Sequence, residues 1–203
     1  LLVLLISWSV SGQCVVEPFI SQSFSGWTLT PKSGSIVKTD RDTVQITVPY
    51  LPQTEPDAYL QLETAADGTQ GFAVGVEMRI FSTAGNCQMV LRDSSSELEG
   101  HYISIALLEA GKLYYLPDLL GRNVFEEVDR QETCRLQAVY KPEIDGITIF
   151  RDGEEKARIE KISEKDAGRW GNFRWNEFRV RLQATRQGET EVQAEFDNFF
   201  LHH

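Results

Sequence analysis

Two acidic residues spaced two positions apart, Glu143 and Asp145, are the first candidates for chemistry in this 203-residue chain. Alternate residues of a β-strand project from the same face, so a Glu-x-Asp pair can bring two carboxylates together. Carboxyl groups about 5 Å apart act as nucleophile and acid/base in retaining glycoside hydrolysis. Gly146 follows Asp145, however, and Asp-Gly is a strong hairpin-turn signal. We therefore interpret Asp145-Gly146 as a turn and predict no catalytic residue.

Aromatic residues offer a second kind of chemistry, because their faces stack on the apolar side of sugar rings. Trp170 lies in the segment GRWGNFRWN, where no alternating pattern would bury it, whereas Trp175 precedes Phe178 and is expected to plug the edge of the fold. Burial in the core is the ordinary alternative for either tryptophan. We predict that Trp170, Tyr102 and Tyr114 contact a ligand.

The chain opens on a hydrophobic leader. Residues 1–10 (LLVLLISWSV) carry no charge and precede the small pair Ser11-Gly12, a pattern typical of the hydrophobic core of a signal peptide. We expect residues 1–12 to be a partial signal peptide, truncated at its start, and the protein to be secreted. A buried first strand is the alternative. The run is too short to span a bilayer, which needs roughly 20 apolar residues, so we expect no membrane insertion.

The chain contains three cysteines, Cys14, Cys87 and Cys134. If the protein is secreted, they enter an oxidising compartment that favours disulfide formation, and one cysteine of the three is left unpaired. Cys87 and Cys134 each open a strand-like run of similar length, so we expect them to lie at the same edge of neighbouring strands and to form a disulfide. A bridge from Cys14 to either is the alternative. A zinc site is not expected, because no CxxC pair occurs and the histidines are not spaced as ligands.

Charge and composition limit the possible partners and the number of domains. The formal net charge is −10, so nucleic acid and acidic lipid surfaces would be repelled over most of the exterior. At 41% hydrophobic residues, the chain is long enough to bury a core of its own, and we expect a single domain over 13–201. Residues 202–203 resemble the remnant of a purification tag.

Turn signals join short alternating runs of β-forming residues along the whole chain. Asp145-Gly146 and Asp152-Gly153 divide residues 134–159 into three strands at the spacing of a meander. Residues 72–81, the longest run, are expected to form a central strand, and 173–184 and 190–201 to form the final hairpin. The pattern predicts an all-β fold, a two-sheet antiparallel β-sandwich with roughly a dozen strands. The other predicted strands are 18–24, 43–48, 58–63, 88–92, 102–108, 112–116 and 124–128.

The order of these segments resembles a known superfamily. The long strand, YISIALLEAGKLYYL, RLQAVY, DGITIFRDGE, the Trp-Asn-x-Phe-Arg-Val segment and the final FDNFFL are similar to the concanavalin A-like lectin/glucanase jelly roll, which includes laminin G domains, legume lectins and laminarinase-type glycosidases. The resemblance extends from Phe19 to Leu201. It implies two curved sheets packed face to face, with ligands on the concave sheet or at the rim loops.

The resemblance also implies where enzymes of this superfamily carry their chemistry. Its retaining glycosidases carry Glu-x-Asp-x-x-Glu, and this chain departs from that motif because Thr148 stands in place of the second glutamate. Its polysaccharide lyases use a His and a Tyr, to which His101-Tyr102 is similar, together with an arginine, for which Arg79 and Arg92 are the nearest candidates. A solvated loop that leads into an ordinary strand is the alternative interpretation of His101.

A calcium ion is the cofactor that the resemblance implies. Many members hold a structural Ca²⁺ through an Asp of the last strand, and Asp197 in EFDNFFL matches that position. Glu17, Asp40 or Asp42 would complete an oxygen shell of the kind Ca²⁺ prefers. The alternative is that Asp197-Asn198 simply ends the strand ladder.

Taken together, these features predict a secreted, non-catalytic binding module. Its expected ligand is carbohydrate, contacted by Trp170, Tyr102, Tyr114, Arg79 and His101. A polysaccharide-active enzyme with an unrecognised site is one alternative. An extracellular structural protein that associates with itself or with an extracellular protein partner through its sheet edges is the other.

Overall fold

Fifteen β-strands dominate the described part of the chain in the computed structural model, and every strand pair in it is antiparallel. The all-β prediction is therefore confirmed. The structure describes residues 14–17, 27–31, 36–40, 43–49, 57–66, 68–82, 85–93, 102–108, 112–116, 123–127, 129, 132–161, 178–186 and 190–202.

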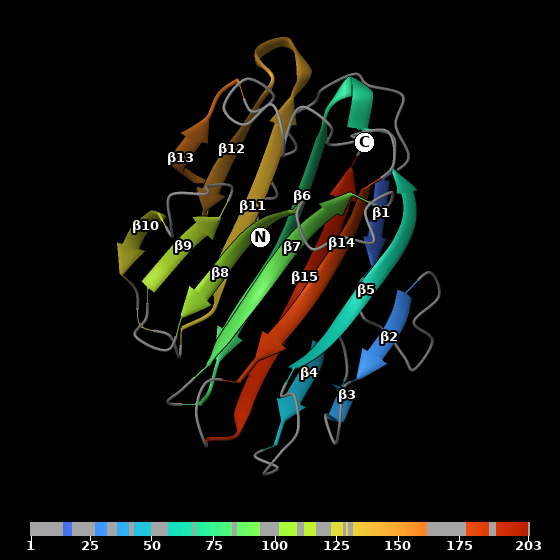
Figure 1. The fold of residues 1–203 in the computed structure, drawn as a ribbon, viewed down its shortest axis with the longest axis vertical. Coiled ribbons are helices and arrows are strands. Elements are labelled where there is room, and N and C mark those ends of the chain that lie inside the picture. The colour runs from blue at the N-terminus through green and yellow to red at the C-terminus, as the bar shows by residue number, and fades with distance from the viewer. Residues whose placement is uncertain are drawn as a thin grey trace, which may run out of the picture.

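The strands form two sheets that lie one behind the other in Figure 1. The eight-stranded sheet consists of β13 (Glu154–Ile159), β12 (Gly146–Arg151), β11 (Cys134–Lys141), β6 (Phe72–Ile80), β15 (Val192–His202), β4 (Thr43–Val48) and β3 (Ile36–Asp40), with β1 (Cys14–Glu17) also pairing with β15. The seven-stranded sheet consists of β10 (Asn123–Glu127), β9 (Lys112–Leu116), β8 (Tyr102–Leu108), β7 (Asn86–Asp93), β14 (Phe178–Thr185), β5 (Asp57–Ala66) and β2 (Trp27–Pro31).

Alternation along the strands builds the core between the sheets. In β14 every second residue, beginning with Phe178, is buried, and in β4 the buried positions are Val44, Ile46 and Val48. An aromatic contact spans the two layers, because the rings of Phe178 in β14 and Phe72 in β6 lie 4.5 Å apart between centroids. Burying such side chains is the main stabilising contribution available to a two-layer sandwich.

The meander at 134–159 forms as predicted. Strand β11 pairs with β12 and β12 with β13, and the turns between them hold Asp145 at φ 45° and Asp152 at φ 51°. Asp tolerates this left-handed backbone better than most residues other than glycine. Strand β6 is central, as predicted, between β11 and β15, although the 11-residue β15 is longer than the 9-residue β6.

The predicted final hairpin is wrong. Strand β14 pairs with β5 and β7, whereas β15 pairs with β1, β4 and β6, so the connection between them passes from one sheet to the other. Both strands bury one face against the same core, and period-two alternation does not reveal in which layer a strand lies.

The N-terminal strands also differ from the prediction. Strands β1, β2 and β3 were not predicted. The predicted strand 18–24 and residues 1–12, predicted to be a partial signal peptide, lie outside the described residues.

Candidate functional site

The face of the seven-stranded sheet that points away from the core carries a continuous set of polar side chains on its two central strands. We call it the β7/β14 outer face. It is defined by the residues that alternate with the buried positions of β7 and β14. Its members with described side chains are Asn86, Gln88, Val90, Arg179, Arg181, Gln183 and Thr185.

The strand register sets how these side chains are arranged. Gln88 lies opposite Gln183, and Val90 lies opposite Arg181. The Gln183 amide Nε2 donates a hydrogen bond of 2.8 Å to the Thr185 hydroxyl, which fixes the orientation of the amide. Val90 is 6% exposed although it faces outward, so other residues cover most of it. The result is a row of amide, hydroxyl and guanidinium groups beside an apolar residue.

Sequence patterns did not single out these residues, although a signal was present. Residues 178–185 read FRVRLQAT, in which buried apolar residues alternate with Arg179, Arg181, Gln183 and Thr185. Each outward position is a hydrogen-bonding residue. Such a run on one strand could have been recognised as a row of polar side chains. The sequence pattern does not reveal that β7 lies beside β14 and supplies the second row.

Two of the predicted ligand residues lie on strands of the same sheet. In β8, Tyr102 pairs with Arg92 of β7, and in β9, Tyr114 pairs with Ala106 of β8. Trp170 and His101 lie outside the described residues. Contact of these four residues with a ligand stays a prediction.

The fifth predicted ligand residue, Arg79, lies on the other sheet. It is on the outward side of β6, where its Nη2 forms an ion pair of 2.6 Å with Oε1 of Glu195 in β15. Oε2 of Glu195 accepts a hydrogen bond of 3.0 Å from Nε2 of Gln45. The Arg79 guanidinium also lies 4.5 Å from the ring centroid of Phe81, which is 40% exposed. The structure therefore does not bring Arg79 together with Tyr102 and Tyr114.

The acidic pair at 143 and 145 lies in a turn, as predicted. Glu143 belongs to a short 3₁₀ helix, Pro142–Ile144, and Asp145 follows it in a left-handed conformation whose N–H donates to the Pro142 carbonyl at 3.0 Å. The two carboxylates thus do not share a strand face. Asp145 instead contributes to raising the pKa of the Tyr140 phenol to about 12, after the larger effect of burial.

The predicted disulfide between Cys87 and Cys134 is absent. No disulfide joins these two buried cysteines, and they lie on different sheets, because β7 belongs to the seven-stranded sheet and β11 to the eight-stranded one. Sheets of a sandwich pack about 10 Å apart, whereas the Cα atoms of a disulfide are usually 4.4–6.8 Å apart. The prediction failed because similar strand lengths do not place two strands in one sheet.

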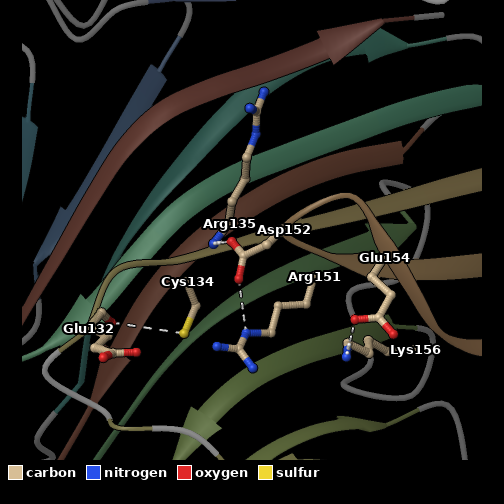
Figure 2. Close-up of polar contacts among 7 residues, drawn as sticks. All are labelled: Glu132, Cys134, Arg135, Arg151, Asp152, Glu154 and Lys156. Atoms are coloured by element: carbon tan, nitrogen blue, oxygen red, sulfur yellow. Dashed lines mark hydrogen bonds and ion pairs between the residues drawn. The ribbon is translucent and has the colours of Figure 1, made fainter. Parts of the chain in front are cut away.

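Cys134 instead borders a polar cluster at the β12–β13 turn, drawn in Figure 2. Its thiol lies 3.9 Å from the carbonyl of Glu132. Asp152 joins two strands there, accepting a hydrogen bond of 3.1 Å from the Arg135 N–H through Oδ1 and pairing with Arg151 Nε at 3.1 Å through Oδ2. Burial raises the pKa of the Cys134 thiol, and the Arg151 charge offsets part of that effect.

The described side chains alone do not supply a metal site. Within the described ranges, no three His, Cys, Asp or Glu side chains approach one another as ligands would. Asp197 Oδ1 accepts a 2.7 Å hydrogen bond from the Asn198 N–H, and Asn198 Nδ2 donates to Glu77 at 2.9 Å. The register places Glu17 opposite Phe199. Calcium binding at Asp197 stays a prediction.

Membrane insertion through a helix has no support in the described ranges, since no helix there has the length and hydrophobicity that a bilayer crossing requires. Sequence comparisons also give no assignment. No protein-family model matches the chain, and no curated protein matches it.

Solved structures do match. An endo-1,3-β-glucanase from Streptomyces sioyaensis aligns with a TM-score of 0.72 at 10% identity, covering 93% of this chain and 94% of the glucanase. The carbohydrate recognition domain of Emp46p in its potassium-bound form aligns with a TM-score of 0.62 at 16% identity, covering 91% and 93%. A sialidase aligns with a TM-score of 0.66 at 10% identity over 87% of this chain, which spans 17% of the sialidase. At these identities the likeness establishes the fold, and the chain has the concanavalin A-like lectin/glucanase fold.

Proposed function

We propose that this protein is a secreted carbohydrate-binding module whose ligand lies across the β7/β14 outer face. The observation that carries the proposal is the ladder formed by Gln88, Gln183, Thr185 and Arg181 on two paired strands. A sugar ring presents several hydroxyl groups that both donate and accept hydrogen bonds. Amide, hydroxyl and guanidinium groups on one surface match that chemistry.

The arrangement also reduces the entropic cost of binding. Strands hold the backbone of each side chain rigidly, and the bond from Gln183 to Thr185 orients one amide before any ligand arrives. Groups that are already oriented lose less conformational freedom when a ligand binds.

The fold neighbours support carbohydrate as the ligand class. One is described as a carbohydrate recognition domain and another as an endo-1,3-β-glucanase. Binding is favoured over hydrolysis because Glu143 and Asp145 lie in a turn of the eight-stranded sheet. In addition, the described side chains of the β7/β14 outer face include no carboxylate, whereas glycoside hydrolysis uses a pair of them.

A glycan array tests this proposal. We expect the protein to bind at least one glycan, and Gln183→Ala to weaken binding by about five- to tenfold, the effect of losing one hydrogen bond. Gln137→Ala is the matched control, because Gln137 lies on β11 of the other sheet. Trp170→Ala in parallel tests the predicted loop contact.

Two results would contradict the proposal. Absence of binding to every glycan would remove carbohydrate as the ligand and favour the alternative of an extracellular structural protein. Equal affinities for wild type, Gln183→Ala and Gln137→Ala would move the site away from the β7/β14 outer face.

A further inference from the structure

Arginines are concentrated at one end of the β7/β14 outer face. Arg179 and Arg181 alternate with the buried Phe178, Val180 and Leu182, so both guanidinium groups extend from the outward side of β14. The register then adds a third arginine, because Arg92 of β7 pairs directly with Arg179. Two guanidinium groups on the same side of one strand attract an anion that lies between them.

Arg181 lies in partly desolvated surroundings. It pairs with Val90, which is 6% exposed, and its own Nε atom is buried. A charge that is partly removed from water interacts more strongly with an ion partner than a fully solvated one does, since the effective dielectric constant is lower. The amides of Gln88 and Gln183 occupy the next positions along the same strands.

The local charge contrasts with that of the whole chain. The formal net charge of the protein is −10, yet among the described side chains at outward positions of β7 and β14 the ionisable ones are Arg179 and Arg181. Among the neighbouring strands, β5 contributes Asp57, which pairs with Thr185 at the opposite end of the face, and Glu63, which lies in the irregular stretch between Val180 and Phe178. A local positive potential on an acidic protein attracts anionic ligands to that surface and repels them elsewhere.

We infer that the carbohydrate bound on the β7/β14 outer face carries carboxylate or sulfate groups, which Arg179 and Arg181 hold while Gln88 and Gln183 bind the sugar hydroxyls. The inference rests on the proposed function and specifies its ligand class. Arginine suits the role because its planar group can donate two parallel hydrogen bonds to one carboxylate or sulfate.

Titration calorimetry with matched ligands tests the inference. The probes are oligogalacturonate beside its methyl ester, which removes the carboxylate charge, and dextran sulfate beside unmodified dextran. A glycan array that contains neutral, carboxylated and sulfated members extends the comparison to other backbones. We expect acidic glycans to bind at least about tenfold more tightly than their neutral counterparts, and added salt to reduce the difference.

Variants locate the site. Arg181→Gln is expected to weaken binding of the acidic probe by about tenfold or more and binding of its neutral counterpart by a smaller factor, because a hydrogen bond between two charged groups is stronger than one to a neutral hydroxyl. Arg135→Gln is the matched control, because Arg135 is exposed on β11 of the other sheet and its side chain extends away from the cluster in Figure 2. Thermal unfolding of each variant confirms that it folds.

The outcomes separate this inference from the proposed function. Binding of neutral glycans alone, sensitive to Gln183→Ala, would overturn the acidic ligand class and leave carbohydrate binding intact. Binding of acidic glycans that falls equally in Arg181→Gln and Arg135→Gln would overturn the assignment to these arginines. Absence of binding to every glycan would overturn both.

Discussion

The Tyr140 phenol links the stability of the fold to alkaline pH. Tyr140 is the penultimate residue of β11, is 6% exposed, and stacks on Phe72 with ring centroids 5.6 Å apart. Burial and the neighbouring Asp145 carboxylate raise its pKa from 10.0 to about 12. In the unfolded chain both effects are absent, so the phenol ionises near its ordinary value. Replacing Tyr140 with Phe removes this difference between the two states.

The size and sign of the effect follow from proton linkage. Below pH 10 the phenol is protonated in both states, and its interactions stabilise the folded protein in full. Between the unfolded value of 10.0 and the folded value of about 12, only the folded state keeps the proton. The free energy of unfolding then falls by about 1.4 kcal/mol per pH unit. Tyr140 thus loses about 2–3 kcal/mol of stabilisation by pH 12.

Urea unfolding at fixed pH measures this loss. Wild type and Tyr140→Phe are unfolded at neutral pH and at several values up to 12, and the difference between their free energies of unfolding is plotted against pH. At neutral pH wild type is expected to be more stable by about 1.5–3 kcal/mol, the contribution of a hydrogen bond to a charged carboxylate. That advantage should shrink steadily above pH 10. The other titrating groups are common to both proteins and cancel in the difference.

A flat difference across this pH range would refute the reasoning. It would mean that the Tyr140 phenol ionises at the same pH in both states, which contradicts its burial and its contact with Asp145. Tyrosinate absorbance, followed by ultraviolet titration of the folded protein, gives an independent reading. One phenol that titrates near pH 12 in wild type should be missing in Tyr140→Phe.

Three further predictions concern the fold. Gly85→Ala is expected to destabilise the protein by more than about 2 kcal/mol by urea unfolding, since Gly85 has φ +94° and an added Cβ would lie 2.6 Å from the Thr185 carbonyl oxygen; an unchanged midpoint would contradict this geometry. Glu195→Ala removes the partner of Arg79 and is expected to cost about 1–3 kcal/mol, whereas Glu154→Ala, which removes an exposed ion pair, should stay within about 0.5 kcal/mol; equal costs would refute the distinction. In a Cys14→Ser background, both core cysteines should resist a thiol reagent in the folded protein and react after unfolding, and no reaction after unfolding would restore the predicted disulfide.

Strand positions could be predicted from the sequence wherever alternation and turn chemistry agreed. Residues 43–48 are the clearest case, because TVQITV alternates without interruption and forms β4 with its three apolar residues buried. The turns at Asp145 and Asp152 could also be predicted, since an Asp-Gly pair favours the positive φ angles that these tight turns require. Strands and turns whose geometry depends on adjacent residues can therefore be predicted from those residues.

Which strands meet could not be predicted in the same way. Cys87 and Cys134 open similar runs and yet belong to different sheets, and Arg79 and Tyr114 are likewise on strands of different sheets. Pairing depends on contacts between residues far apart in the chain, and a period-two pattern fits any antiparallel neighbour. Every functional hypothesis that joined distant residues therefore depended on information that the pattern does not contain.

The candidate site is nevertheless specified by the core. Strand β14 contributes to the core and to the candidate site. Its buried residues hold the strand in the sandwich, and its outward residues form half of the β7/β14 outer face. A shift of one residue would move Arg179, Arg181 and Gln183 into the core and expose Phe178. Such a shift would be very costly, because the two arginines would be buried without compensating partners. The hydrophobic alternation that builds the fold thus also fixes where the guanidinium and amide groups stand. Substitutions at outward positions should therefore change ligand binding with little effect on stability, whereas substitutions at Phe178 or Leu182 should lower stability first and binding only as a consequence.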